Sequence, residues 1–307
     1  MSNLSSPRFL LKPLKPPQHR FAYIGVPHDA ATSLGNPGGR FGPQALREAL
    51  QSIFDWRLKD GRLAHLDHGI IDLSAVEVAD LGDIALSYYD TAKTVEQTYQ
   101  AVRGALEAGY LPIVVGGDHG VTFPPVKALH DTCEGAIGLI QLDAHCDLLD
   151  FSERQGRFSG SSGTRRSVEL ERLSGPNVAQ VGLRGLTTVE QFALAHELGL
   201  RRISATRFVE LGPKAAAEQA LAWASDGTQA IYLTIDLDVL TPGEAPGTGW
   251  PEPGGLTAQQ LFDFVRVVAP HVAALDVAEL NPIYDSRAGA TAILAGRLIL
   301  ECIIARL

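Results

Sequence analysis

The chain has few cysteines, no long uncharged apolar run and no excess of basic residues. Its three cysteines, Cys133, Cys146 and Cys302, are too few and too scattered for a disulfide framework or a thiolate metal site, which favours a reducing compartment. The 26 Lys and Arg residues stand against 35 Asp and Glu residues, so the formal net charge is −9 and a general nucleic-acid-binding surface is not expected. The length of 307 residues, 45% of them hydrophobic, is enough for a large buried core.

Secretory and membrane-spanning segments are not expected either. Residues 1–20 carry Lys and Pro where a secretory signal needs an apolar run. The apolar stretch 292–307 is interrupted by Arg297 and Glu301 and is too short and too charged to cross a bilayer, so we predict a buried helix there. A cytoplasmic protein without a membrane partner is therefore expected.

Strand-like and helix-like segments alternate along most of the chain. Residues 1–20 contain four prolines and are predicted to form an extended N-terminal arm. The apolar runs expected to be buried parallel strands are 21–26, 111–117, 136–143, 177–183, 230–236 and 272–277. The segments with helical period are 43–53, 91–108, 188–198, 213–224 and 257–268. No linker or repeat interrupts residues 21–307, which predicts a single catalytic domain of the α/β class, with three α/β/α layers and a central parallel sheet.

Polar side chains follow four of these predicted strands at the point where each strand ends. The carboxyl ends of parallel strands share one rim of the sheet, where ligand sites gather. The residues at these ends are His119, Asp143, His145, Asp147, Asp236, Asp238 and Glu279. We therefore expect these side chains to lie close together.

Most of these side chains are carboxylates, which repel one another unless cations lie between them. Within residues 143–147 and 236–238, the i, i+2 spacing directs alternate side chains to one side of an extended strand end. A bridging carboxylate from each group would hold two metals roughly 3.5–4 Å apart, and a water between the metals would be acidified into a nucleophile at neutral pH. Oxygen and nitrogen donors without thiolate favour Mn2+, with Zn, Co or Ni as alternatives.

The blocks that carry these residues resemble the signature blocks of the arginase/agmatinase (ureohydrolase) family. They read GGDH at 116–119, DAHCD at 143–147, TIDLDVLTPGEAPGTGWPEPGG at 234–255 and DVAELNP at 276–282, and PGGRFGPQALRE at 37–48 resembles the N-terminal block of the family. The resemblance runs in order from about residue 20 to the end of the chain. It implies the arginase–deacetylase fold, two Mn2+ per subunit and hydrolysis of a guanidine or amidine C–N bond, in the manner of agmatinases, which release urea and an amine.

The resemblance also implies a role for each matched residue. One metal would be held by His119, Asp143, Asp147 and Asp236. The other would be held by Asp143, His145, Asp236 and Asp238, so that Asp143 and Asp236 are shared. The catalytic residues would be Asp147, which hydrogen-bonds the nucleophile, and Glu279, which grips the guanidinium through paired hydrogen bonds. A small guanidine or amidine substrate is implied, and so is a homotrimer or homohexamer.

Several residues depart from the agmatinase pattern. Agmatinases carry a His-Gly-Thr motif, whose histidine is thought to shuttle protons, where this chain has Ser162-Gly163-Thr164. Ser162 and Thr164 are therefore candidate substrate-binding residues, and His28 is a candidate replacement for the shuttle, although a loop histidine without a role is the commoner case. Trp250 stands where agmatinases commonly have Thr, so it either closes the pocket around a small planar substrate or simply packs.

The substrate stays open between several alternatives. Formimidoylglutamases of the same family resemble this chain in having Ser-Gly-Thr at that position, and they release formamide. Another small guanidine or guanidino acid is also compatible. An extra acid in the pocket would suit an amine tail and an arginine would suit a carboxylate, and the variable loop offers both, at Asp150, Glu153, Arg154 and Arg165.

Overall fold

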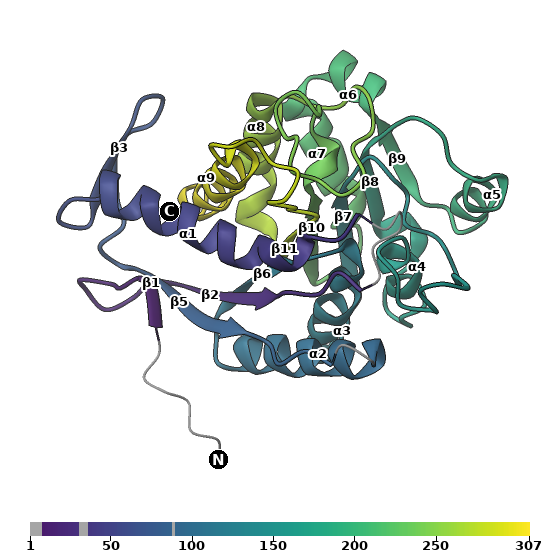
Figure 1. Ribbon diagram of the computed structural model, residues 1–307, viewed down its shortest axis with the longest axis horizontal. Coiled ribbons are helices and arrows are strands. Elements are labelled where there is room, and N and C mark those ends of the chain that lie inside the picture. The colour runs from purple at the N-terminus through teal and green to yellow at the C-terminus, as the bar shows by residue number, and fades with distance from the viewer. Residues whose placement is uncertain (1–7, 31–35, 88–89) are drawn as a thin grey trace.

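The fold is built on one large sheet with helices on both sides (Figure 1). The computed structural model describes residues 8–30, 36–87 and 90–307. The nine-stranded sheet has the order β1-β5-β2-β6-β11-β10-β7-β8-β9, and all neighbours are parallel except the antiparallel pair β1 and β5. In this order the strands are β1 (Arg8–Leu11), β5 (Val76–Asp83), β2 (His19–Val26), β6 (Leu111–Gly116), β11 (Ala274–Ala278), β10 (Ala230–Asp236), β7 (Ile137–Leu142), β8 (Val178–Leu183) and β9 (Arg201–Ser204).

Helices form a layer on each face of the sheet (Figure 1). On one face α1 (Gly42–Arg57), α7 (Pro213–Ala224), α8 (Ala258–Val268) and α9 (Ala290–Ile304) pack against one another and share one hydrophobic core. On the other face α2 (Thr91–Glu107) packs against α3 (Phe123–Thr132) over a second group of buried side chains. The remaining helices are α4 (Gly163–Ser167), α5 (Val189–Glu197) and α6 (Ala205–Leu211). The predicted three-layer α/β/α architecture is confirmed.

The predicted strands correspond to β2, β6, β7, β8, β10 and β11, within a few residues at each end. All six are interior strands of the sheet whose residues are mostly buried, which is why they read as apolar runs. The predicted helices correspond to α1, α2, α5, α7 and α8, and α8 begins with the capping box of Thr257 and Gln260. The buried helix expected near the C-terminus is α9.

The structure adds strands that the sequence pattern did not predict. Arg8–Leu11 form the edge strand β1, so this part of the predicted extended arm is a folded element, while residues 1–7 lie outside the described residues. Edge strands such as β1 and β9 have four residues each, too few to show a period, and they are specified by pairing with a distant neighbour. A separate hairpin is formed by β3 (Arg62–His65) and β4 (Gly69–Asp72).

Glu301 is a fully buried carboxylate that joins this hairpin to two helices. On α9 its oxygens accept hydrogen bonds from Arg297 at 2.6 Å and from Arg266 of α8 at 2.8 Å, and the Nε2 atom of His65 lies 3.2 Å away. Burial acts to raise the pKa of Glu301, but hydrogen bonds from Arg266, Arg297 and His65 outweigh it and lower the pKa to about 2. The network therefore stabilises the folded state while the carboxylate is ionised.

Replacing Glu301 with Gln is expected to lower the free energy of unfolding by about 2 kcal/mol, because the guanidinium groups of Arg266 and Arg297 lose the negative charge that they pair with. The folded pKa lies below the unfolded value of about 4.3, so this contribution is complete above about pH 5 and is lost as the pH falls towards about 2. Urea unfolding of both proteins should show the difference narrowing over that window. Glu218→Gln, which removes an exposed pair with Lys214 at 3.9 Å, should change little. An equal effect of the two substitutions would contradict the role of the buried network.

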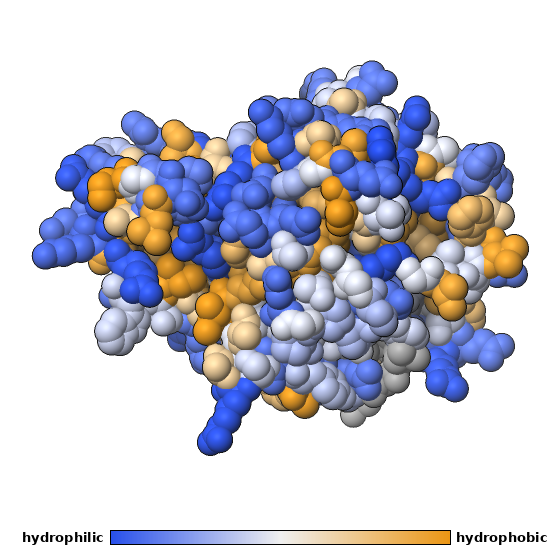
Figure 2. All heavy atoms as spheres, turned by 90° about the horizontal axis from the view of Figure 1, so that it is seen from above, coloured by the Kyte–Doolittle hydropathy of each residue, from blue (hydrophilic) through white to orange (hydrophobic). Residues whose placement is uncertain are grey.

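Among the described residues, no helix is both long enough and apolar enough to cross a membrane. The face seen in Figure 2 carries mostly hydrophilic side chains with apolar patches between them. Large hydrophobic side chains that are exposed on the molecule include Trp56, Leu66 and Ile70.

Candidate metal centre

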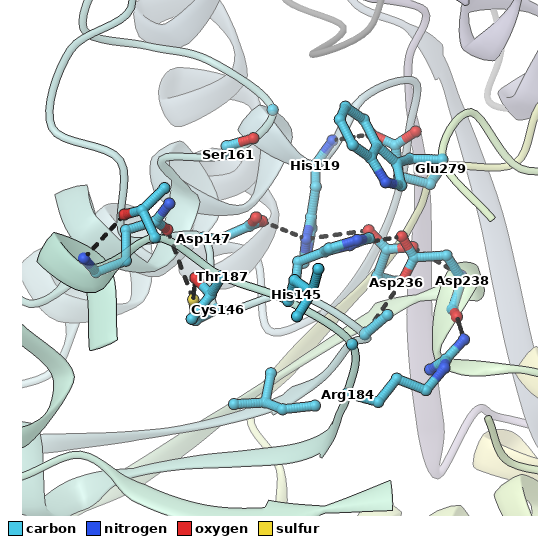
Figure 3. Close-up of a pocket in the computed structure, with 18 of the residues that line it drawn as sticks. His119, His145, Cys146, Asp147, Ser161, Arg184, Thr187, Asp236, Asp238 and Glu279 are labelled. Atoms are coloured by element: carbon cyan, nitrogen blue, oxygen red, sulfur yellow. Dashed lines mark hydrogen bonds and ion pairs between the residues drawn. The ribbon is translucent and has the colours of Figure 1, made fainter. Parts of the chain in front are cut away.

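The four predicted strand ends meet on neighbouring strands. The strands β6, β11, β10 and β7 are adjacent in the sheet, and their carboxyl ends lead to His119, Glu279, Asp236 and the segment 143–147, respectively. Figure 3 shows the rings of His119 and His145 and the carboxylates of Asp147, Asp236 and Asp238 pointing toward one another. The side chains that were expected at four strand ends therefore lie together in one site.

The first group surrounds His119, which begins the 3-10 turn η2 (His119–Thr122). Its Nδ1 atom lies 3.0 Å from Oδ2 of Asp143, 2.8 Å from Oδ2 of Asp147 and 3.2 Å from Oδ2 of Asp236. All four side chains are buried, and His119, Asp143 and Asp236 form a group of potential metal ligands. This is the set predicted for one metal, with Asp147 beside it.

The second group surrounds His145. Its Nδ1 atom lies 3.0 Å from Oδ2 of Asp238 and 3.6 Å from Oδ1 of Asp143, and these three residues form another group of potential ligands. Asp143 belongs to both groups and faces each with a different oxygen, as expected of a bridging ligand. Asp236 belongs to the first group, and its Oδ1 atom accepts the backbone N–H of Asp238 at 2.8 Å. The sharing of Asp236 between two metals therefore stays a prediction.

The electrostatics of the cluster favour bound cations. Burial, followed by the charges of neighbouring aspartates, raises the pKa of Asp236 and Asp238 and raises that of Asp147 to about 6. For Asp143 burial acts in the same direction, but the neighbouring imidazoles of His119 and His145 outweigh it and lower the pKa. So many buried carboxylates are costly without compensating positive charge.

Three buried atoms of the cluster have no hydrogen-bond partner in the described part of the chain: Nδ1 of His119, Oδ2 of Asp147 and Nε2 of His145. The first two face each other at 2.8 Å. Buried polar atoms are normally satisfied, so orphaned ligand atoms that face one another fit a metal. Asp147 and Glu279 also have left-handed backbones, with φ of 48° and 63°, which is uncommon outside glycine and clusters at functional sites. The residues of the cluster therefore fit the metal ligands that the sequence predicted.

A series of buried hydrogen bonds, which the sequence pattern did not predict, orients the ring of His119 from the side opposite the cluster. Its Nε2 atom lies 2.7 Å from the hydroxyl of Thr234, which donates to Oδ1 of Asp276 at 2.7 Å, and Tyr232 donates to the other oxygen of Asp276 at 2.8 Å. The hydroxyl of Thr234 therefore accepts a hydrogen bond from the Nε2–H group of His119, and the unprotonated Nδ1 atom faces the cluster. Strand alternation could have placed Thr234 and Asp236 on one face, but the cross-strand partner Asp276 required the register of β10 and β11.

Thr234→Val is expected to weaken metal binding by about 10- to 100-fold, because the ring of His119 loses the acceptor that fixes its tautomer. Thr234→Ser, which keeps the hydroxyl, is the matched control and should bind metal as the wild type does. Calorimetric titration of Mn2+ into metal-free protein measures both. Equal affinities for the valine variant and the wild type would contradict this role.

Two of the predicted substrate-binding residues lie behind the site instead of in it. The hydroxyl of Ser162 closes a local turn, accepting the N–H of Ser159 at 2.8 Å, and the hydroxyl of Thr164 donates to Gln141 at 2.7 Å. Gln141 in turn donates to Asp143 at 2.6 Å, so Thr164 supports a ligand of the cluster. Ser161, the neighbour of Ser162, is the residue that lines the pocket.

The predicted replacement for the proton shuttle also lies elsewhere. His28 is buried and lines a second, smaller cavity together with Val26, Thr94, Val121 and Phe158. The described residues that line the metal pocket do not include it. His28 follows β2 in sequence and was therefore expected near the rim of the sheet. The structure instead directs its ring toward α2.

Residues of the cluster line a pocket of about 540 Å3. Trp250 lines this pocket, edge-on to His145 with ring centroids 5.9 Å apart. Glu279 also lines it, and its Oε1 atom accepts the backbone N–H of His119 at 2.9 Å. Burial, followed by the charges of Asp118 and Asp238, raises the pKa of Glu279 to about 8. A cationic group beside this carboxyl would therefore favour its ionised form.

Together the fold and the site define a class: three-layer α/β proteins that hold two overlapping groups of metal ligands at the carboxyl ends of a parallel sheet. Residues 19–305 match the Arginase family, and the chain belongs to that family.

Named relatives extend over most of the chain. The guanidino acid hydrolase of Homo sapiens mitochondria is 32% identical over 291 residues, which cover 92% of this chain and 77% of the human protein. The mitochondrial agmatinase of Gallus gallus is 30% identical over 285 residues, covering 91% of this chain and 79% of that protein. The solved structure of formimidoylglutamase from Bacillus subtilis superposes with a TM-score of 0.83 at 26% identity, covering 94% of this chain and 87% of that one.

Proposed function

We propose that the protein is a binuclear manganese-dependent hydrolase of a small linear guanidino compound, which it converts to urea and an amine. The observation that carries the proposal is the pair of ligand groups that share Asp143, in one pocket with Glu279. The relatives named guanidino acid hydrolase and agmatinase support the choice of substrate class.

The residues of the cluster would hold two divalent ions. One would be bound by His119, Asp143, Asp147 and Asp236, and the other by Asp143, His145, Asp236 and Asp238. These oxygen and nitrogen donors suit Mn2+, with Ni, Co or Zn as alternatives. Bound ions of this kind supply chemistry by acidifying a water into a nucleophile at neutral pH.

The side chains around the ions would bind and orient the substrate. Glu279 would pair with the guanidinium through two hydrogen bonds, which places the central carbon of this poor electrophile near the cluster. Asp147 has an unpaired oxygen and would hold the nucleophile by a hydrogen bond, as the second catalytic residue. Trp250 beside His145 would limit the entry of water.

The first test is to incubate the Mn-loaded protein with agmatine, guanidinobutyrate, guanidinopropionate, arginine, guanidine and formiminoglutamate, and to identify the small product by mass. Urea from a guanidino compound is the expected result. Formamide from formiminoglutamate alone would overturn the proposal in favour of a second candidate, a formimidoylglutamase-like hydrolase. That candidate is favoured by Ser162-Gly163-Thr164 and by the likeness to the Bacillus subtilis structure.

Domain organisation, assembly and location complete the proposal. We infer that residues 21–307 act as a single catalytic domain in a homotrimer or homohexamer, and light scattering of the purified protein would measure the number of subunits. A cytoplasmic location is supported by the three cysteines, which are all free in the structure.

A further inference from the structure

Both acidic and basic side chains line the metal pocket. The acidic residues among its described lining are Asp147, Asp236, Asp238 and Glu279, which all belong to the cluster at the ends of β7, β10 and β11. Two arginines also line the pocket: Arg184, which follows β8, and Arg202, the second residue of the edge strand β9. Apolar side chains of Leu183, Leu186 and Phe192 line the same pocket.

The guanidinium of Arg184 is already hydrogen-bonded to backbone carbonyl groups. Its guanidinium donates to the carbonyl oxygens of Asp238 at 2.6 Å, Glu252 at 2.8 Å and Leu240 at 3.1 Å, so it holds the loop that follows β10 (Figure 3). Burial also lowers the pKa of Arg184. A ligand would have to displace these carbonyls to reach its donors, which makes Arg184 part of the framework.

Arg202 is placed differently. It is half-buried on β9, and its guanidinium carbon lies 4.8 Å from the ring centroid of Phe192. Across residues 8–30, 36–87 and 90–307, no carboxylate forms an ion pair with it. Stacking on an aromatic ring restrains the guanidinium and leaves the hydrogens at its edge available to an anion.

The sheet register places Arg202 at a useful distance from the cluster. It is paired with Gln180 of β8, and Gln180 is paired with Gln141 of β7, so the three side chains lie on one face of the sheet. Gln141 contacts Asp143 of the cluster. Two strand spacings, about 10 Å, therefore separate the strand of Asp143 from that of Arg202.

The acids that would suit an amine tail do not lie in this pocket. Asp150 of the variable loop is hydrogen-bonded to Arg166 and lies 3.6 Å from Arg165 and from Arg157. Asp150, Glu153 and Arg154 are not among the described residues that line the pocket. The available charge for a substrate tail is thus positive.

On the basis of the proposed function, we infer that the substrate is a linear amidine that ends in a carboxylate, and that Arg202 binds this carboxylate while Glu279 binds the amidine. A zwitterion of this kind matches the charges of Glu279 and Arg202, and its methylene chain matches the apolar side chains that line the same pocket. A guanidino acid and a formimino amino acid share this chemistry. Agmatine, which ends in an ammonium, would place a cation beside Arg202.

The test compares the Mn-loaded wild type with Arg202→Met, Arg202→Lys and Arg202→Glu. The substrates are guanidinoacetate, guanidinopropionate, guanidinobutyrate, formiminoglutamate, agmatine and butylguanidine, whose tail has no charge. The matched control is Arg201→Met, because Arg201 is the exposed neighbour on β9 and lies over Trp223 instead of in the pocket. Thermal unfolding verifies that each variant is folded.

We expect Arg202→Met to lower kcat/KM for the preferred carboxylate substrate by about 10- to 100-fold, mainly through a higher KM. The loss on butylguanidine should be less than about threefold, Arg202→Lys should recover part of the activity, and Arg202→Glu should shift the preference toward agmatine. Urea or formamide among the products distinguishes the guanidino acids from the formimino acid.

Two results would overturn the inference while leaving the proposed function intact: a wild-type preference for agmatine over every carboxylate substrate, or equal effects of Arg201→Met and Arg202→Met. Absence of product from all substrates, butylguanidine included, would overturn the proposed function instead. In that event calorimetric binding of guanidinobutyrate still decides the inference. Weaker binding to Arg202→Met than to Arg201→Met supports the carboxylate site, and equal binding rejects it.

Discussion

Asp236→Ala is expected to lower the bound metal from two ions per chain to one or none, and to reduce turnover by about 1,000-fold or more. Asp236 lies 3.2 Å from Nδ1 of His119, and the resemblance to the arginase family assigns it to both metals. The metals contribute several kcal/mol of stabilisation to the transition state, which corresponds to a factor of this size. Elemental analysis of dialysed protein and a urea assay measure the two losses together.

Loss of the fold must be separated from loss of the metal in this experiment. Burial raises the pKa of Asp236 well above its usual range, because the ionised carboxylate is costly in this buried site. In the absence of metal, removal of this carboxyl should therefore not destabilise the folded chain. The metal-free variant should therefore unfold at a temperature equal to or above that of the metal-free wild type. Asp226→Ala, at an exposed turn, is the control for both measurements. Full activity of Asp236→Ala would exclude a binuclear site at this position.

Glu279→Gln is expected to keep both metals but to lower kcat/KM for guanidino substrates by about 100- to 1,000-fold. The amide is the same size and can still accept the N–H of His119, so the backbone there should persist. It cannot form the charged, paired hydrogen bonds that a guanidinium makes with a carboxylate, and losing one partner of a desolvated charge pair costs 2 kcal/mol or more. Steady-state kinetics and elemental analysis of the same preparation measure activity and metal content.

A matched control for this substitution is Glu190→Gln. Glu190 is an exposed glutamate in the first turn of α5, close in sequence to the pocket residues Thr187 and Thr188 but not among the described residues that line the pocket. It should leave kcat/KM unchanged within about twofold, as most exposed substitutions do. Loss of metal from Glu279→Gln would instead make Glu279 a ligand and would remove its assignment to the guanidinium.

A comparison of Asp236→Ala with Glu279→Gln separates metal binding from substrate binding. Asp236 should act through the metals and Glu279 through the substrate, although both side chains line one pocket. If both variants lost metal equally, the cluster would extend to β11. If neither lost metal, the ions would have to bind elsewhere.

The sequence by itself determined the central part of the fold and the side chains of the site. The strands β6, β7, β10 and β11 are buried on both faces, so each appears as a local apolar run that ends at a polar residue. Parallel strands place their carboxyl ends on one rim, and this rule needs no knowledge of distant contacts. His119, the aspartates and Glu279 could therefore be assigned to one site.

Only the tertiary structure decided which atoms face one another. The hydrogen bonds from His119 through Thr234 to Asp276 depend on the register of β10 and β11, in which Thr234 is paired with Asp276, 42 residues away in sequence. Ser162 and His28 follow strands whose ends form the rim, yet neither side chain enters the metal pocket. The hydroxyl of Ser162 is hydrogen-bonded within its own loop, and His28 lines another cavity. Arg184 and Arg202 come from the neighbouring strands β8 and β9 and line one pocket. Arg184 is held by carbonyl groups, whereas Arg202 is not paired with any described carboxylate. Local patterns specify where a side chain starts, whereas its direction and its free hydrogen-bonding capacity depend on neighbours that only folding brings together.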